Sequence, residues 1–109
     1  MGRSYDQVWD ADVKRELRSP SADIQFEAVK AAGELGLESA RRILLDLLEE
    51  EGTDSEIRAE VIWALSEIGG EEVREALDNL LEKTEDEEEA ELIDEALYNL
   101  TESSAGKWT

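Results

Sequence analysis

The sequence predicts an all-α fold built from repeated helical hairpins, and two observations support that prediction. Alanine, leucine, glutamate, arginine and isoleucine dominate the 109 residues while proline occurs once, which is typical of helices joined by short turns. A pattern also recurs along the chain, as IQFEAVKAAGELG at 24–36, IRAEVIWALSEIG at 57–69 and EAELIDEALYNLT at 89–101. Between the copies lie two further segments that align with each other, SARRILLDLLEE and EVREALDNLLEK. A period of about 33 residues predicts hairpins stacked side by side.

Local signals place the ends of the expected helices. The opening segment SYDQVWDADVKRELRSP is expected to form a helix that stops before Pro20, because a residue that precedes proline is displaced from helical conformation. Gly36, Gly69 and Gly70 lie where a left-handed residue would end a helix. Six antiparallel helices are therefore expected, at about 5–18, 23–35, 38–51, 54–68, 71–83 and 87–101.

Two helix starts match the capping-box pattern, in which a threonine hydroxyl bonds the amide three residues later and a glutamate reaches back to the cap. The pairs are Thr53 with Glu56 and Thr84 with Glu87. A chain of this length is expected to form one domain over residues 1–109 with a single modest core. Residues 102–109, which include Trp108, are expected to form a flexible tail.

Negative charge is concentrated in the second half of the chain. The net charge is −19, from 30 acidic and 11 basic side chains. Residues 1–48 hold seven basic and nine acidic side chains, a net charge of −2, so residues 49–109 carry the other −17. Nucleic acids and anionic lipids are bound through lysine and arginine, so this balance predicts neither as a partner. A basic protein would be attracted, and the alternative is that the acidic residues only keep the protein soluble.

Two missing residue types argue against catalysis. The sequence contains no histidine and no cysteine, which removes the commonest general base, every Ser-His-Asp arrangement, cysteine nucleophiles and thiolate metal sites. The acidic run TEDEEEAE also lacks the ligand spacing and the turn glycine of a calcium-binding loop. We therefore predict no enzyme activity, no cofactor and no metal site. The lack of cysteine and of a long apolar run favours a cytoplasmic location and no membrane partner.

The segment IRAEVIWALSEIGGEEVREALDNLLEKTEDEE resembles the short HEAT-like repeat of the phycobilisome-lyase type, whose pattern is V-R-x-x-A-x-x-A-L-x-x-I-G followed by a leucine-rich helix. The matching residues are Ile57, Arg58, Val61, Ala64, Leu65, Ile68 and Gly69. The first copy has Gln25 in place of the arginine, and the third lacks both the arginine and the glycine, as a terminal repeat would. Over about residues 12–101, the resemblance implies an α-solenoid that binds other proteins. It also implies a convex side of first helices, a concave side of second helices, and an arginine at 58 that bonds the neighbouring repeat.

Trp63 interrupts the amphipathic pattern of its helix. At about 100° per residue it lies opposite the core-facing arc, in the slot that holds Lys30 and Glu95 in the other copies. Its indole is expected to lie at the level of Phe26 in the preceding copy. Trp63 and Phe26 are therefore candidates for an exposed aromatic patch that binds a partner or a second copy. The alternative is that they are covered within the chain, by each other or by Tyr5 and Trp9 of the opening helix.

Arg41 and Arg74 are the second pair of candidate partner-binding residues. They occupy equivalent positions in two successive second helices, facing away from the predicted core. Stacked repeats would place them together as a short basic ridge in an acidic groove. The alternative is that each arginine pairs with a carboxylate on its own helix.

Two functions from different classes follow. The first is a non-enzymatic protein–protein interaction or scaffold module, a monomer or weak homodimer, that binds a protein partner of basic character through the aromatic patch or the acidic half. The second rests on the resemblance alone. It is an accessory or chaperone-like subunit of a bilin-lyase-type system, which would hold a chromophore or a client protein in the concave groove.

Overall fold

The computed structural model describes residues 12–50 and 52–106, and within those ranges it is helical with no strand. Residues 12–16 form a helical turn ahead of α2. The remaining elements are α2 (Ala22–Leu35), the 3₁₀ turn η1 (Glu38–Ala40), α3 (Arg41–Glu49), α4 (Ser55–Ile68), α5 (Glu71–Lys83) and α6 (Glu87–Gly106). The predicted all-α fold is confirmed.

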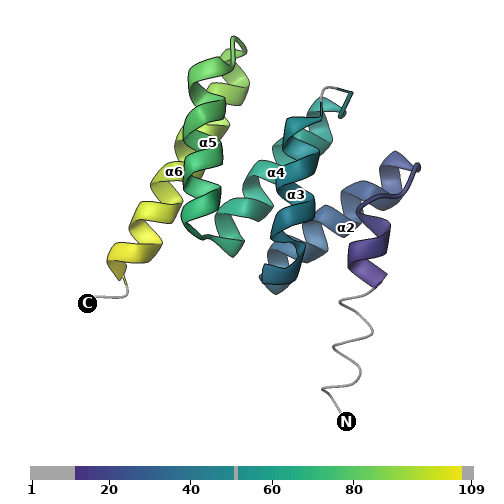
Figure 1. The fold of residues 1–109 in the computed structure, drawn as a ribbon. Coiled ribbons are helices and arrows are strands. Elements are labelled where there is room, and N and C mark those ends of the chain that lie inside the picture. Colours follow the sequence, from purple (N-terminus) through teal and green to yellow (C-terminus); the bar gives the residue numbers. More distant parts are fainter. Residues whose placement is uncertain (1–11, 51, 107–109) are drawn as a thin grey trace.

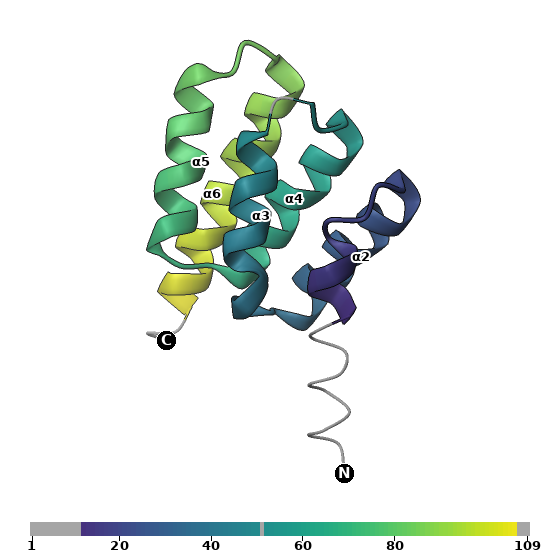
Figure 2. The same ribbon diagram turned by 45° about the vertical axis from the view of Figure 1, so that its right-hand side comes forward.

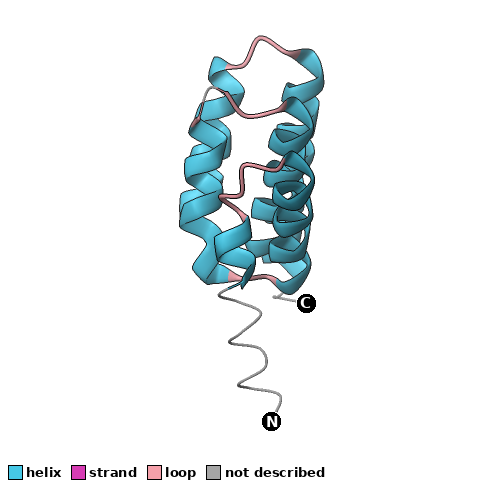
Figure 3. Ribbon diagram, turned by 90° about the vertical axis from the view of Figure 1, so that its right-hand side faces the viewer, coloured by secondary structure: helices cyan, strands magenta, loops and turns pink. Residues whose placement is uncertain are grey.

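The helices form two layers, which Figure 3 shows edge-on. One layer contains α2, α4 and α6 side by side, and the other contains residues 12–16, α3 and α5 (Figures 1 and 2). Each hairpin packs against the next one along the chain, and the described part measures 43 × 40 × 17 Å. A plate that is two helices thick and grows by one hairpin per repeat is an α-solenoid, as predicted.

The core lies between the two layers. It contains the apolar residues that recur at helical spacing, because each helix buries one stripe of its surface against the other layer. Its largest fully buried side chains are Leu17, Leu44, Ile62, Leu65, Leu77, Ile93, Val13, Val29, Val61 and Val73. The first-helix layer is tightly packed where α2 meets α4, because Ala28, Ala32 and Gly33 of α2 are all buried.

Three expected boundaries differ from the structure. The expected helix at 38–51 is divided into η1 and α3 and ends at Glu49. The opening helix, expected over 5–18, ends at residue 16 and gives way to a turn, and its residues 5–11 lie outside the described part. At the other end α6 continues to Gly106, so 102–106, expected to belong to a tail, are helical. The sequence ESSA after Thr101 contains no proline or glycine that would stop the helix before Gly106.

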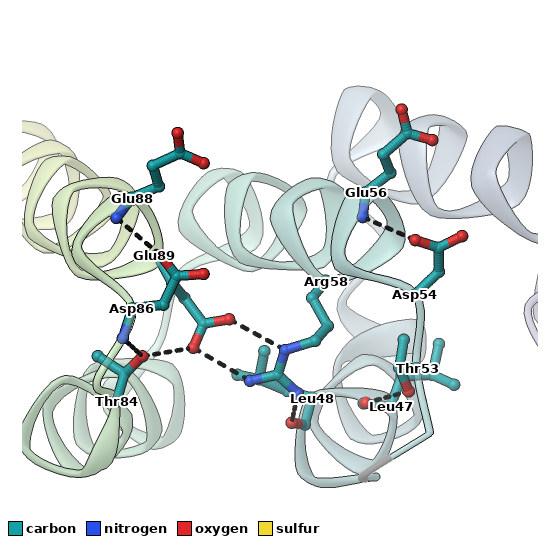
Figure 4. Close-up of polar contacts among 10 residues, drawn as sticks. All are labelled: Leu47, Leu48, Thr53, Asp54, Glu56, Arg58, Thr84, Asp86, Glu88 and Glu89. Carbon is teal, nitrogen blue, oxygen red and sulfur yellow. Dashed lines mark hydrogen bonds and ion pairs between the residues drawn. The ribbon is translucent and has the colours of Figure 1, made fainter.

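The expected capping boxes are wrong in detail, because aspartates cap both helices. Asp54 accepts a hydrogen bond from the backbone N–H of Glu56 at 3.2 Å, and Asp86 accepts one from Glu88 at 3.0 Å (Figure 4). Aspartate is as effective at this position as serine, and each helix begins later than the threonine would require. Thr53 instead donates its hydroxyl to the carbonyl of Leu47, near the end of α3, at 3.1 Å.

Arg58 links three helices. Its Nη1 donates to the carbonyl oxygen of Leu48 in the last turn of α3 at 2.8 Å, while its Nε and Nη2 donate to the two carboxylate oxygens of Glu89 at 3.0 and 3.3 Å (Figure 4). The Glu89 carboxylate also accepts the Thr84 hydroxyl at 3.0 Å. Both charged side chains are about four-fifths buried. The implied role of Arg58, bonding the neighbouring repeat, is confirmed.

Gln25 performs the equivalent task in the first repeat. Its side-chain amide donates to the carbonyl oxygen of Leu17 at 2.9 Å, at a junction one repeat before the one at which Arg58 bonds Leu48. The departure from arginine at this slot therefore preserves the bond to the preceding second helix. What glutamine cannot supply is the charged link onward to the following repeat.

Gln25→Ala is expected to lower the free energy of unfolding by about 1 kcal/mol, because the Leu17 carbonyl loses its partner in a half-buried setting. Urea denaturation followed by circular dichroism measures the change. Glu27→Ala, an exposed change on the same helix, is the control and should alter the value by less than about 0.5 kcal/mol. Equal effects of the two substitutions would show that the amide bond contributes nothing.

Candidate functional site

Trp63 projects from α4 toward α2 and rests on Gly33. A Cβ atom placed on Gly33 would lie 2.7 Å from Cζ3 of Trp63 and 2.8 Å from Cα of Ala64, so only a glycine allows this approach. The indole is nevertheless 39% exposed. One edge of the ring is thus supported by the neighbouring repeat while the rest meets solvent.

Phe26, the other aromatic candidate, is half-buried and packs against the core. It therefore contributes less exposed surface than the sequence pattern suggested, because it packs against the core. Tyr5 and Trp9, the other residues considered as cover for Trp63, lie outside the described part. The residue that supports Trp63 is Gly33, which the sequence analysis did not single out.

Arg41 is held against the turn that joins α4 to α5. A Cβ atom on Gly70 would lie 3.2 Å from Cζ of Arg41, and the side chain is half-buried. Its Nε is buried and makes no hydrogen bond. Gly70, the residue that the guanidinium approaches, is the N-cap of α5. The Arg41 side chain is therefore packed against the turn and is only partly open to solvent.

Arg74 lies in the first turns of α5, close to the same turn. Its backbone N–H donates to the carbonyl oxygen of Gly70 at 3.1 Å. Its side chain is exposed and borders a shallow depression with Gly70, Glu71 and Leu100. Of the two candidate arginines, Arg74 is therefore the one whose side chain is presented to solvent.

A groove of about 530 Å³ lies between α4 and α6, on the other side of Trp63 from Gly33. Its apolar lining consists of Ile62, Trp63, Leu92, Ala96 and Tyr98. Its polar lining consists of Ser66, Glu67, Glu95 and Asn99. The groove therefore combines an apolar surface with two carboxylates, and the described residues that line it include no lysine or arginine.

The groove gathers most of the large hydrophobic side chains that are exposed in the described part. Five large hydrophobic side chains are exposed in the described part, and three of them line this groove: Trp63 (39% exposed), Leu92 (39%) and Tyr98 (65%). The other two, Ile24 and Leu35, belong to α2. Clustered exposed apolar side chains rimmed by polar ones mark a binding surface more often than scattered ones do.

Sequence reasoning missed Leu92, Tyr98 and the groove itself. A signal was present, because both residues are apolar although they lie beside the core positions Ile93 and Leu97 of the third repeat. Trp63 breaks the pattern of the second repeat in the same way. Neighbouring repeats that each expose a large apolar side chain on their facing helices predict a shared surface.

A second groove, also of about 530 Å³, lies between α3 and α5 in the second-helix layer. Its apolar lining includes Leu45, Leu48 and Leu80, and its charged lining contains both signs: Glu49, Glu50, Arg58 and Lys83. The resemblance placed a chromophore or client on this layer. Arg58 is already bonded to Glu89 and Leu48. Lys83 is the other cation that lines this groove.

None of the helices described is both long and apolar enough to cross a membrane. Within the described residues, no group of three or more acidic side chains lies close enough together to hold a metal ion.

A family model described as HEAT repeats matches residues 12–98, which is most of the chain. No curated protein shows a significant similarity to the sequence. HEAT repeats commonly mediate contacts between proteins, and the family is typically non-catalytic. The match is to HEAT repeats in general and does not distinguish the short lyase type.

Proposed function

The chain belongs to the HEAT-repeat family, and from that premise we propose that it is a non-enzymatic interaction module that binds a basic protein in the groove between α4 and α6. One observation carries the proposal, namely that three of the five exposed large hydrophobic side chains in the described part line a single groove whose charged residues are both acidic. Apolar anchors at the centre of an interface supply affinity, and complementary charge around them supplies speed and selectivity.

The surrounding charge supports a basic partner. Glu67 and Glu95 lie in the groove, and residues 49–109 as a whole carry a net charge of −17. A field of one sign steers an oppositely charged protein toward the surface, and its effect weakens as salt is added. The groove between α3 and α5 has charges of both signs and offers no comparable selection.

Photo-crosslinking tests the proposal in cells that contain the natural partner. We expect p-benzoylphenylalanine at position 98 to give an adduct with a protein of net positive charge, because Tyr98 is the most exposed apolar side chain of the groove. The same crosslinker at position 27, which is exposed on α2 away from the groove, is the control and should not capture that protein. Mass spectrometry identifies the adducts.

Two results would contradict the proposal. One is equal capture of the same proteins from both positions, which would indicate non-specific contact. The other is an adduct at position 98 that contains only a second copy of this chain, accompanied by a dimer in light scattering that Trp63→Glu converts to a monomer. That outcome would assign the groove to self-association.

A further inference from the structure

The two junctions within the first-helix layer are built on the same plan, and they differ in the small residue of one helix and in the side chain that faces it from the next. Where α2 meets α4, Gly33 faces Trp63 and Ala64. The repeat offsets place Ser66 in the slot of Gly33, and Glu95 and Ala96 in the slots of Trp63 and Ala64. Ser66, Glu95 and Ala96 all line the groove between α4 and α6. The second junction therefore has a glutamate where the first has an indole.

This difference explains why a groove is present at the second junction. At the first, the Trp63 ring lies against the small residue, with its Cζ3 atom 2.7 Å from where a Cβ of Gly33 would be. At the second, Glu95 is exposed, and a space of about 530 Å³ is left above Ser66. The floor of that space requires no polar ligand, because the Ser66 hydroxyl already donates to the carbonyl oxygen of Trp63 at 2.7 Å.

We infer that the groove between α4 and α6 accepts an aromatic side chain of the partner, flanked by lysine or arginine. The ring would lie across Ser66 as the Trp63 indole lies across Gly33, between the apolar walls formed by Trp63, Leu92 and Tyr98. The cationic neighbours would meet Glu67 and Glu95, and a guanidinium or ammonium also binds favourably over an indole or phenol ring. The inference rests on the proposed function and specifies what the partner segment must contain.

Short peptides test the aromatic preference directly. The probes are acetyl-Lys-Trp-Lys-amide, acetyl-Lys-Leu-Lys-amide and acetyl-Lys-Ala-Lys-amide, which have equal charge and differ only in the central side chain. Titrations followed by the amide shifts of the ¹⁵N-labelled protein should show the tryptophan peptide binding about five-fold more tightly than the leucine peptide. The largest shifts should occur at Ser66, Glu95 and Ala96. Equal affinities of the tryptophan and leucine peptides would overturn the inference.

Variants test whether the space above Ser66 is the binding site. Glu95→Trp should place an indole over Ser66 and reduce binding of the tryptophan peptide about ten-fold or more, while the helical circular dichroism is unchanged. Glu95→Gln removes the charge without filling the space and should weaken binding only about two-fold. Lys30→Trp adds an indole in the equivalent slot of α2, away from the groove, and should leave binding at least as strong. Undiminished binding to Glu95→Trp would overturn the inference.

The two proposals fail separately. If crosslinking at position 98 captures a basic protein but the peptides show no aromatic preference, the interaction function stands and the aromatic anchor is wrong. If the peptides bind at Ser66 with the expected preference but position 98 captures no basic protein in cells, the proposed function is wrong although the groove selects aromatic rings.

Discussion

Arg58→Ala is expected to lower the free energy of unfolding by about 2 to 3 kcal/mol, more than any other substitution proposed for this chain. The substitution removes three hydrogen bonds, one to the Leu48 carbonyl and two to the Glu89 carboxylate, and leaves both acceptors largely buried. Loss of one partner of a buried pair costs about 3 to 5 kcal/mol, and the remaining exposure of this pair reduces that figure. Thermal unfolding should shift down by roughly 10 °C.

Two further variants separate the geometry of Arg58 from its charge. Arg58→Lys keeps the charge but cannot make the bidentate contact with Glu89, so it should recover no more than about half of the lost stability. Arg15→Ala breaks a surface ion pair with Asp12, whose side chains are 79% and 50% exposed at a separation of 3.8 Å, and should cost less than about 0.5 kcal/mol. A similar small change for Arg58→Ala would show that the bridge does not stabilise the fold.

Gly33→Ala is expected to destabilise the protein by about 2 kcal/mol, although alanine is the better helix former. In an exposed helix interior the same change would stabilise by about 1 kcal/mol. Here the added methyl group would lie 2.7 Å from Trp63 and 2.8 and 2.9 Å from the Cα and Cβ atoms of Ala64, so α2 and α4 must move apart. Forcing extra volume into a close-packed interface costs about 1 to 3 kcal/mol. Urea denaturation measures the net change.

The control for this prediction is Gly52→Ala. No atom lies within 4 Å of a Cβ placed there, so the unfolding free energy should change by less than about 0.5 kcal/mol. Combining Gly33→Ala with Trp63→Ala should not restore the lost stability, because the backbone of Ala64 still obstructs the methyl group. A stabilised Gly33→Ala variant would mean that the two helices are not held this closely.

Hydrophobic periodicity allowed most of the fold to be predicted. The recurring stripe that contains Ala28, Val61 and Ile93 is buried, and each of these residues has the same place in its own repeat. The bonding role of Arg58 was implied by the resemblance, but its acceptor was not foreseen. Glu89 is one of several consecutive acidic residues at the start of α6, and only the rotation of that helix determines which carboxylate meets the arginine. A hydrophobic pattern shows which face of a helix is buried, but it does not show which residues of two facing helices meet.

The candidate site was predicted in part. Trp63 was identified from its place on the wrong face, and it does line the groove. Gly33 was missed, although a glycine in the middle of a helix usually has a packing reason. Phe26 was expected to be outward-facing and is half-buried, since the pattern of one helix does not reveal how much a neighbouring helix covers. The groove depends on what two helices leave unfilled between them, which requires their separation and relative rotation.

The layered arrangement also has a consequence for the order in which the helices unfold. Since each hairpin contacts only its neighbours, the free energy of unfolding is approximately a sum of local terms and of couplings across each junction. The bridge from Arg58 to Glu89 is one such coupling, between the middle repeat and the last. Without it, α6 should open while the other helices stay folded, and the amide hydrogens of α6 should exchange sooner than those of α4. The Arg58 guanidinium is therefore expected to couple the unfolding of α6 to that of the middle repeat.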